Sequence, residues 1–272
     1  HYPLRRQRQM CIRDSIKGLR KAYGSIVAVE SLSFNVRKGE FFGLLGPSGC
    51  GKSTTLKIIA GLEDSDKGDI YLKGRRLNEI PVHKRQTAMV FQNYALFPHL
   101  TVFNNIAFGL KMQKAPGEEI RSRVEEILTM VQLPDLADRY PGQLSGGQQQ
   151  RIALARVLVL KPHVLLLDEP LSNLDAKLRE TMRIELKDIQ RKVGITTIFV
   201  THDIQEAFAL SDRVAVMNQG HIEQIGSPQE IYESPSTEFV ATFVGQPNFF
   251  DGKINNISHG CAIFLSEQGI RF

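Results

Sequence analysis

The chain has 272 residues, 42% of them hydrophobic, and carries 34 basic and 29 acidic side chains. This length suits one large domain with a smaller appendage. No apolar run approaches the roughly 18–20 residues that a transmembrane helix needs, so a role at a membrane would require a partner. The cysteines Cys11, Cys50 and Cys261 are far apart and form no C-x-x-C pair, which argues against a zinc site or disulfide framework and favours a reducing compartment.

Most of the excess positive charge lies at the N-terminus. Residues 5–15 read RRQRQMCIRDS and match the translation of a sequencing-library transposon adapter; a native basic arm is the alternative. Without residues 1–15 the basic and acidic totals become 30 and 28, a net charge of +2. We therefore interpret 1–15 as an adapter artefact, and charge gives no reason to expect a nucleic-acid partner.

Short alternating or apolar runs predict strands, and stretches with apolar residues three to four apart predict helices. Strands are expected at 16–23, 26–36, 41–45, 69–77, 87–91, 164–168 and 196–201. Helices are expected at 52–60, 118–131, 143–160, 176–193 and 231–243, and a hairpin at 214–225. The order of strand, helix and strand over 164–201 argues for an α/β fold with a mostly parallel sheet covered by helices.

The segment Gly46–Ser53 reads GPSGCGKS and has the form G-x-x-x-x-G-K-S, between a predicted strand and a predicted helix. Glycines at 46, 49 and 51 would let backbone N–H groups close around phosphate oxygens, and the following helix points its positive end at them. Lys52 is expected to reach the β- and γ-phosphates of ATP, and Ser53 to hold Mg²⁺. The whole predicted phosphate-binding set is Gly46, Pro47, Ser48, Gly49, Cys50, Gly51, Lys52, Ser53 and Thr54.

Two carboxylates follow the buried run VLLL at 164–167. Asp168, at the end of the strand, is expected to hold Mg²⁺ through water, and Glu169 to act as the general base toward the attacking water. Cys50 lies just before a helix N-terminus, where a thiolate is favoured, so we expect it to react with alkylators and to be protected by Mg-ATP.

The segment LSGGQQQRIALARVL at 144–158, together with these motifs and THD at 201–203, resembles the ATP-binding-cassette (ABC) ATPases from about residue 19 to 243. Ser145 is a predicted helix N-cap. The resemblance implies a RecA-like P-loop core with a helical signature subdomain at about 93–158 and an antiparallel β region. It also implies that Ser145, Gly146, Gly147 and Gln148 face the γ-phosphate bound by a second copy in a head-to-tail dimer.

The same resemblance assigns four further residues. Tyr23 would stack on adenine, and Gln92 would sense Mg²⁺ and the membrane partner. Asp175 would cross the dimer interface, and His202 would lie near the γ-phosphate. The implied catalytic set is thus Glu169, His202, Lys52 and Gln92, and the implied metal set is Ser53, Gln92 and Asp168.

The domain boundaries follow from these matches. We expect the ATPase domain at 16–244 and a truncated fragment of a regulatory β-barrel at 245–272, because 28 residues after Val244 are too few to close a barrel. Such a fragment would be poorly anchored to the ATPase domain.

Two classes of ABC ATPase are weighed. Lys52 and Ser145 are 93 positions apart, which leaves no room for the long coiled coil of DNA-repair members, and the single cassette differs from the paired cassettes of translation members. The segments at 82–110 and 169–179 resemble importer ATPases for polyamines, with ferric iron and sugar importers as alternatives. The resemblance implies two permease subunits, an indirect solute-binding protein, and a peripheral position on the cytoplasmic face of the bacterial inner membrane. Apolar residues at 94–97 would form either a permease dock or subdomain core.

Overall fold

The computed structural model describes residues 14–258 and 261–266. Its main sheet has six strands in the order β10-β9-β3-β8-β7-β6. The strands β3 (Phe41–Leu45), β6 (Thr87–Val90), β7 (Val164–Asp168), β8 (Thr196–Thr201) and β9 (Arg213–Asn218) run parallel, and β10 (His221–Gly226) pairs antiparallel with β9. Every residue of β3 and β8 is buried, as expected for strands with helices on both faces. The predicted, mostly parallel sheet is confirmed.

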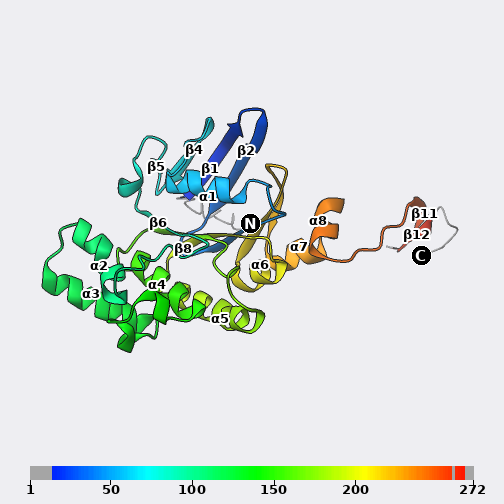
Figure 1. The fold of residues 1–272 in the computed structure, drawn as a ribbon. Coiled ribbons are helices and arrows are strands. Elements are labelled where there is room, and N and C mark those ends of the chain that lie inside the picture. Colours follow the sequence, from blue (N-terminus) through cyan, green and yellow to red (C-terminus); the bar gives the residue numbers. More distant parts are fainter. Residues whose placement is uncertain (1–13, 259–260, 267–272) are drawn as a thin grey trace, which may run out of the picture.

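A second, antiparallel sheet has the order β2-β1-β4-β5 and is formed by β1 (Asp14–Tyr23), β2 (Ile26–Val36), β4 (Lys67–Leu72) and β5 (Arg75–Arg76). Helix α1 (Lys52–Ala60) lies between the two sheets (Figure 1). One apolar cluster joins all three layers, with Leu19 and Val29 from the antiparallel sheet, Leu56 from α1, and Leu44 from the main sheet. This burial holds the start of α1 at the edge of the main sheet.

The structure corrects several predicted boundaries in this region. The strand predicted at 69–77 is divided, because Lys73 and Gly74 form a turn with φ values of +50° and +79°. Strand β1 begins before Ile16, since Asp14 and Ser15 pair with Val36 and Asn35 of β2. Residues 1–13, which hold most of the predicted adapter segment, lie outside the described residues.

Three helices form a unit beside the sheets (Figure 1), as the predicted helical subdomain requires. They are α2 (Val102–Met112), α3 (Gly117–Met130) and α4 (Gly146–Leu158), and they share one apolar cluster. The sequence prediction missed α2 as an element, although its N-cap signal is present: the Thr101 hydroxyl accepts a hydrogen bond from the N–H of Asn104. Short 3₁₀ turns occur at Val82–Lys84, Pro134–Leu136 and Pro141–Gln143, so α4 begins at Gly146 and not at Gln143.

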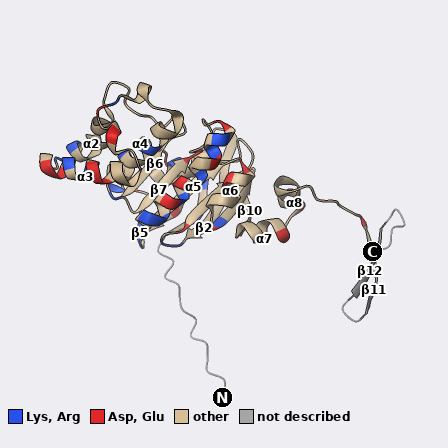
Figure 2. Ribbon diagram, turned by 90° about the horizontal axis from the view of Figure 1, so that it is seen from below, with Lys and Arg blue, Asp and Glu red and all other residues tan. Residues whose placement is uncertain are grey.

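The remaining helices are α5 (Ala176–Val193), α6 (Ile204–Leu210), α7 (Pro228–Glu233) and α8 (Glu238–Val244). Acidic and basic side chains are interspersed along α3 and α5 (Figure 2). The prediction of a single helix at 231–243 is wrong, because a non-helical segment at 234–237 separates α7 from α8. Pro235 disfavours a helical conformation at the residue before it, and Ser234 has φ −138°. A new N-cap, Thr237, then starts α8.

A hairpin follows α8 along the chain. Strands β11 (Gly252–Ser258) and β12 (Cys261–Ser266) form a two-stranded antiparallel sheet of their own. In Figure 1 this hairpin lies apart from the two large sheets and their helices. Helix α8, in contrast, packs Val240 and Val244 into an apolar cluster with β9 and α6.

We predict that removing residues 247–272 leaves the melting temperature of the ATPase domain within about 2 °C of the full chain, because β11 and β12 pair only with each other. A matched truncation after residue 236 also removes α8. It should lower the melting temperature by about 6 °C or more, since each buried valine contributes about 1.5–3 kcal/mol. Differential scanning calorimetry of both proteins measures this. A large loss in the shorter deletion would make the hairpin part of the domain's core.

Candidate functional site

The phosphate loop connects β3 to α1 and is held closely against its neighbours. A Cβ at Gly46 would overlap the carbonyl oxygen of Met217, and Gly51 has φ +99° with its Cα beside the carbonyl of Ala28. A side chain at either position would therefore displace the loop. The Lys52 side chain is 5% exposed and curls back over the loop, where its Nζ donates to the carbonyls of Gly46 (2.8 Å) and Pro47 (2.9 Å).

The loop presents a row of backbone donors. Within the described chain, the N–H groups of Gly49, Gly51, Lys52, Ser53 and Thr54 donate to no protein acceptor. They stand at the N-terminus of α1, where the helix dipole adds positive potential. Donors and lysine together form a concavity suited to the phosphates of a nucleotide.

Ser53 and Asp168 meet next to this loop. The Ser53 hydroxyl donates to Asp168 Oδ1 at 2.8 Å, which brings together residues 115 positions apart in the chain. Burial raises the pKa of the Asp168 carboxyl, while the hydrogen bond from Ser53 acts in the opposite direction. A hydroxyl and a carboxylate are ligands of the hard-oxygen type that Mg²⁺ prefers. The described residues contain no group of three or more His, Cys, Asp or Glu that could hold a metal by itself.

Glu169 is the centre of a second cluster. Its backbone has φ +43°, so the chain turns at the residue directly after β7, and its N–H donates to the carbonyl of Val200 at 3.1 Å. Gln92 Nε2 donates to Glu169 Oε2 at 3.3 Å, and His202 Nδ1 lies 3.2 Å from Glu169 Oε1. A strained backbone at such a place is typical of a functional residue. The structure thus brings Gln92, Glu169 and His202 together.

The loop that carries Gln92 is fixed by contacts that the sequence did not reveal. Asn173 Nδ2 donates to the carbonyl of Gln92 at 2.6 Å. The Arg156 guanidinium donates to the carbonyls of Tyr94 (3.0 Å) and Ala95 (2.6 Å). In each contact a side chain donates to a backbone carbonyl 61–81 positions away in the sequence. The only sequence signal for Asn173 is its position inside LSNLDA.

The apolar residues of this loop divide between the two interpretations left open by the sequence. Tyr94 is buried in the cluster of the helical unit, and Leu96 packs against the same cluster, so both belong to the core. Phe97 is half-buried and its ring lies 4.7 Å from that of Phe108, which is exposed on α2. A docking surface here would consist of Phe97 and Phe108, without Tyr94 and Leu96.

Tyr23 ends β1 and is 47% exposed. Its hydroxyl donates to Glu63, shortly after the end of α1, and the Lys21 ammonium lies 5.4 Å from the ring centroid. Tyr23 therefore lies on the antiparallel sheet, and its ring is accessible at the surface.

The signature residues lie on the helical unit. Ser145 is the N-cap of α4, as predicted, and forms a capping box: its hydroxyl accepts from Gln148 N–H, and Gln148 Oε1 accepts from Ser145 N–H. Asp175 is the N-cap of α5 and accepts from Leu178 N–H at 3.0 Å. In the part of the chain that the structure describes, no hydrogen bond or ion pair joins these residues, or Gly146 and Gly147, to the phosphate loop.

The expectation for Cys50 is wrong. Its side chain is 3% exposed, and burial raises the pKa of the thiol, although Lys52 acts in the opposite direction. The helix N-terminus would stabilise a thiolate, but burial opposes it more strongly, because Cys50 belongs to the apolar cluster between the sheets. Ser48 and Pro47 occupy the outer side of the loop instead.

Comparison with known proteins agrees with this geometry. A model of the family described as "ABC transporter" matches residues 29–172. The chain is 54% identical over 257 residues to the spermidine/putrescine import ATP-binding protein PotA of Oleidesulfovibrio alaskensis, covering 94% of this chain and 69% of that protein. It is 52% identical over 246 residues to the Fe(3+) ions import ATP-binding protein FbpC of Fusobacterium nucleatum, covering 90% and 66%. The chain thus spans about two thirds of the length of these relatives.

Solved structures give the same family. The dimeric ATP-binding cassette MJ0796, in a post-hydrolysis state bound to ADP and Pi, matches with a TM-score of 0.70 and 35% identity over 79% of this chain and 98% of that one. CbiO1 from Clostridium perfringens, part of an ABC transporter complex, matches with a TM-score of 0.76 and 31% identity over 82% and 91%. The chain belongs to the ATP-binding subunits of the ABC transporter family. Among the described residues, none of the helices has the length and hydropathy to cross a membrane.

We predict that iodoacetamide modifies Cys50 in the folded protein at pH 8 at least about tenfold more slowly than in the protein unfolded with urea. A raised thiol pKa keeps the native side chain protonated to higher pH, so little thiolate is present, and burial limits access. Peptide mass spectrometry at Cys50 gives the rate. A folded-state rate equal to the unfolded one, reduced by Mg-ATP, would restore the original expectation.

Proposed function

We propose that this chain is the ATP-hydrolysing motor subunit of an importer for a small solute of the polyamine type. The observation that carries the proposal is the position of Glu169, held between Gln92 and His202 beside the Ser53–Asp168 pair and the phosphate loop. Similarity to PotA proteins supports the solute class. Similarity to FbpC supports ferric iron as the second candidate, and a sugar is a third.

The residues that would hold the phosphates and Mg²⁺ already lie together in the structure, while Tyr23 is on the antiparallel sheet. The backbone donors of 49–54 and Lys52 would surround the β- and γ-phosphates, and Tyr23 would contact the base. Ser53 and Asp168 would hold Mg²⁺, with Gln92 nearby; the ion neutralises phosphate charge when it is bound. The donor set fits the metal because it consists of hard oxygen atoms.

Glu169 would accept the proton of the water that attacks the γ-phosphate. The hydrogen bond from Gln92 Nε2 fixes one carboxylate oxygen, and the contact with His202 Nδ1 fixes the other. His202 is exposed, so it can also reach the γ-phosphate side of the site. Positioned in this way, the carboxylate can orient a water along the line of displacement.

A second copy of the chain would complete the site. At the capped start of α4, Ser145 is exposed, Gly146 and Gln148 are partly buried and Gly147 is buried, and within the described residues none of them hydrogen-bonds to the phosphate loop of its own chain. Its free N–H groups at Gly146 and Gly147 suit the γ-phosphate of a partner, and Asp175 would lie at the same interface. A solved relative is a dimeric cassette. Closure of two copies around two ATP molecules would be a population shift driven by contacts present only in the closed dimer.

The motor would act on two permease subunits, with a solute-binding protein acting indirectly, at the cytoplasmic face of the bacterial inner membrane. The half-buried ring of Phe97 and the exposed ring of Phe108, next to the loop of Gln92, are a reasonable contact for one permease segment. A soluble ABC ATPase of DNA repair or translation is the alternative from another class. The 93 positions between Lys52 and Ser145, which hold α1, the short strands β4–β6 and the helices α2 and α3, favour the importer.

We expect Glu169→Gln to retain ATP binding while lowering ATP turnover by about 10²-fold or more, because the amide has similar shape and cannot accept the proton. Phosphate release measures turnover, and gel filtration with ATP should show a dimer that accumulates. Glu125→Gln, an exposed change on α3, is the matched control and should behave as wild type. Turnover within a few-fold of wild type would remove Glu169 from the role of base.

The solute is tested by uptake in two bacterial strains, one lacking its PotA-type ATPase and one lacking its FbpC-type ATPase. We expect the chain to restore uptake of radiolabelled putrescine in the first strain, while Glu169→Gln does not. Restored ferric-iron uptake without putrescine uptake would replace the polyamine assignment by iron. Active ATP turnover with no uptake in either strain would favour the soluble class.

A further inference from the structure

A cavity of about 430 Å³ lies at the amino-terminal ends of the parallel strands, whereas the phosphate loop is at their carboxyl ends. It is lined by residues that precede β7, at 161–163, and residues that precede β8, at 194–195. The parallel strands therefore separate it from Asp168 and Glu169, which stand at their carboxyl ends. The opposite wall is the helix α3, so the cavity lies where the helical unit meets the main sheet. Its volume is within the range of small-molecule sites, about 300–1,000 Å³.

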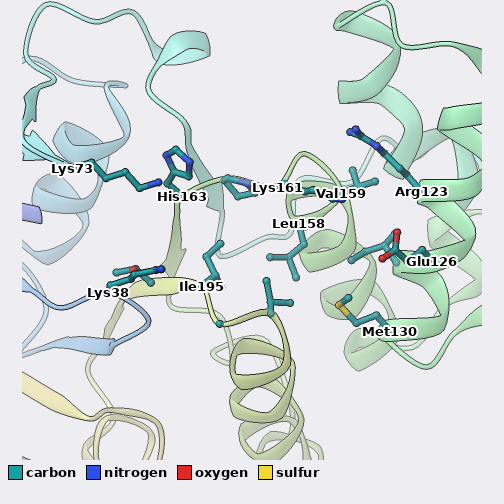
Figure 3. A pocket seen from close by; sticks show the side chains of 15 residues that line it. Lys38, Lys73, Arg123, Glu126, Met130, Leu158, Val159, Lys161, His163 and Ile195 are labelled. Atoms are coloured by element: carbon teal, nitrogen blue, oxygen red, sulfur yellow. The ribbon is translucent and has the colours of Figure 1, made fainter. Parts of the chain in front are cut away.

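The cavity has two chemically different parts. Figure 3 shows Lys38, Lys73 and His163 gathered on one side, with Lys161 close to His163. Leu158, Ile195 and Met130 form an apolar floor toward α3 (Figure 3), and Val193 also lines the cavity. Among the described residues that line the cavity, one side chain is acidic, Glu126, and four are cationic: Lys38, Lys73, Lys161 and Arg123.

Two of these cations, Lys38 and Lys161, are available to a ligand. The side chains of Lys38 and Lys161 are exposed, and in the described part of the chain no ion pair or side-chain hydrogen bond engages them. Arg123 differs, because its guanidinium pairs with Glu119 at 2.5 Å and is fixed to α3. A surplus of cations beside an apolar floor attracts a negative group at one end and removes apolar surface from water at the other.

We propose that this cavity binds a small amphipathic anion, whose acidic group lies among Lys38, Lys73, Lys161 and His163 and whose apolar part covers Leu158, Ile195 and Val193. The acidic group is a carboxylate or a phosphate, since lysine ammonium groups bind both. The nucleotide site does not account for the cavity, because the residues of the nucleotide site are at the carboxyl ends of the parallel strands. The ligand would contact both the helical unit and the starts of β7 and β8.

The test is isothermal titration calorimetry of the full chain with decanoate and with decyl phosphate. We expect saturable binding of at least one of them, and the comparison assigns the acidic group. Decylammonium and acetate are the matched probes: the first reverses the charge and the second removes the apolar part. Neither should bind measurably. Equal binding of decylammonium and decanoate would overturn the proposal.

Variants place the binding in this cavity. Lys38→Glu and Lys161→Glu should each weaken the bound anion by about tenfold, since a charged contact is lost and a repulsive one gained. Val193→Glu, at the apolar end where the side chain is 38% exposed, should weaken it as well. Arg121→Glu is the control, because it makes the same change of charge on α3 at an exposed position outside the lining.

All four substitutions are at surface positions, and melting curves will show whether each variant is folded. Wild-type affinity in the folded cavity variants would locate the anion elsewhere and overturn the assignment. The result is independent of the proposed motor function, because the titration contains no nucleotide and Glu169→Gln should bind the same anion with unchanged affinity.

Discussion

The alignment of neighbouring parallel strands is the constraint on which the site depends. In the register of the main sheet Leu45 pairs with Thr201, and Asp168 pairs with Val200, so β3, β7 and β8 end at one level. The residues that follow these ends are the phosphate loop, Glu169 and His202. Segments separated by more than a hundred positions therefore meet, and the hydrogen bond from Ser53 to Asp168 joins two of them directly. The hydrogen bonds of the sheet and the burial of both its faces supply the free energy that keeps them together.

Two adjacent carboxylates acquire different roles from this arrangement. Asp168 is the last residue of β7 and keeps the strand conformation, which directs its side chain to Ser53 on α1. Glu169 has left-handed backbone geometry, and its side chain turns to Gln92 and His202 instead. A regular strand would also send successive side chains to opposite sides, but it would not bend the chain into the loop that carries Asn173. The backbone conformation at one residue thus directs two adjacent carboxylates to different partners.

The sequence predicted the parts of the structure that depend on local pattern. The strand and helix around the phosphate loop, the helix at 176–193 and the N-cap at Ser145 all agree with the structure, because apolar spacing and cap residues are local signals. Where tertiary contacts decide, the sequence left the answer open or predicted it wrongly. It left open whether Tyr94 belongs to the core, which the helical unit provides, and it did not predict the burial of the Cys50 thiol under the second sheet. Pro235 indicates an interruption of the helix in the sequence, whereas the apolar spacing over 231–243 predicts one continuous helix.

Arg156 gives the helical unit a mechanical property. It is on α4 and holds the backbone of the loop that follows Gln92, while Ser145 stands at the other end of the same helix. Eleven residues at 1.5 Å each make a rigid arm of roughly 16 Å. A tilt of about 10° around the arginine would then move Ser145 by roughly 3 Å, about the length of one hydrogen bond. A displacement of the loop that tilted α4 by this angle would therefore be large enough to make or break a hydrogen bond at Ser145.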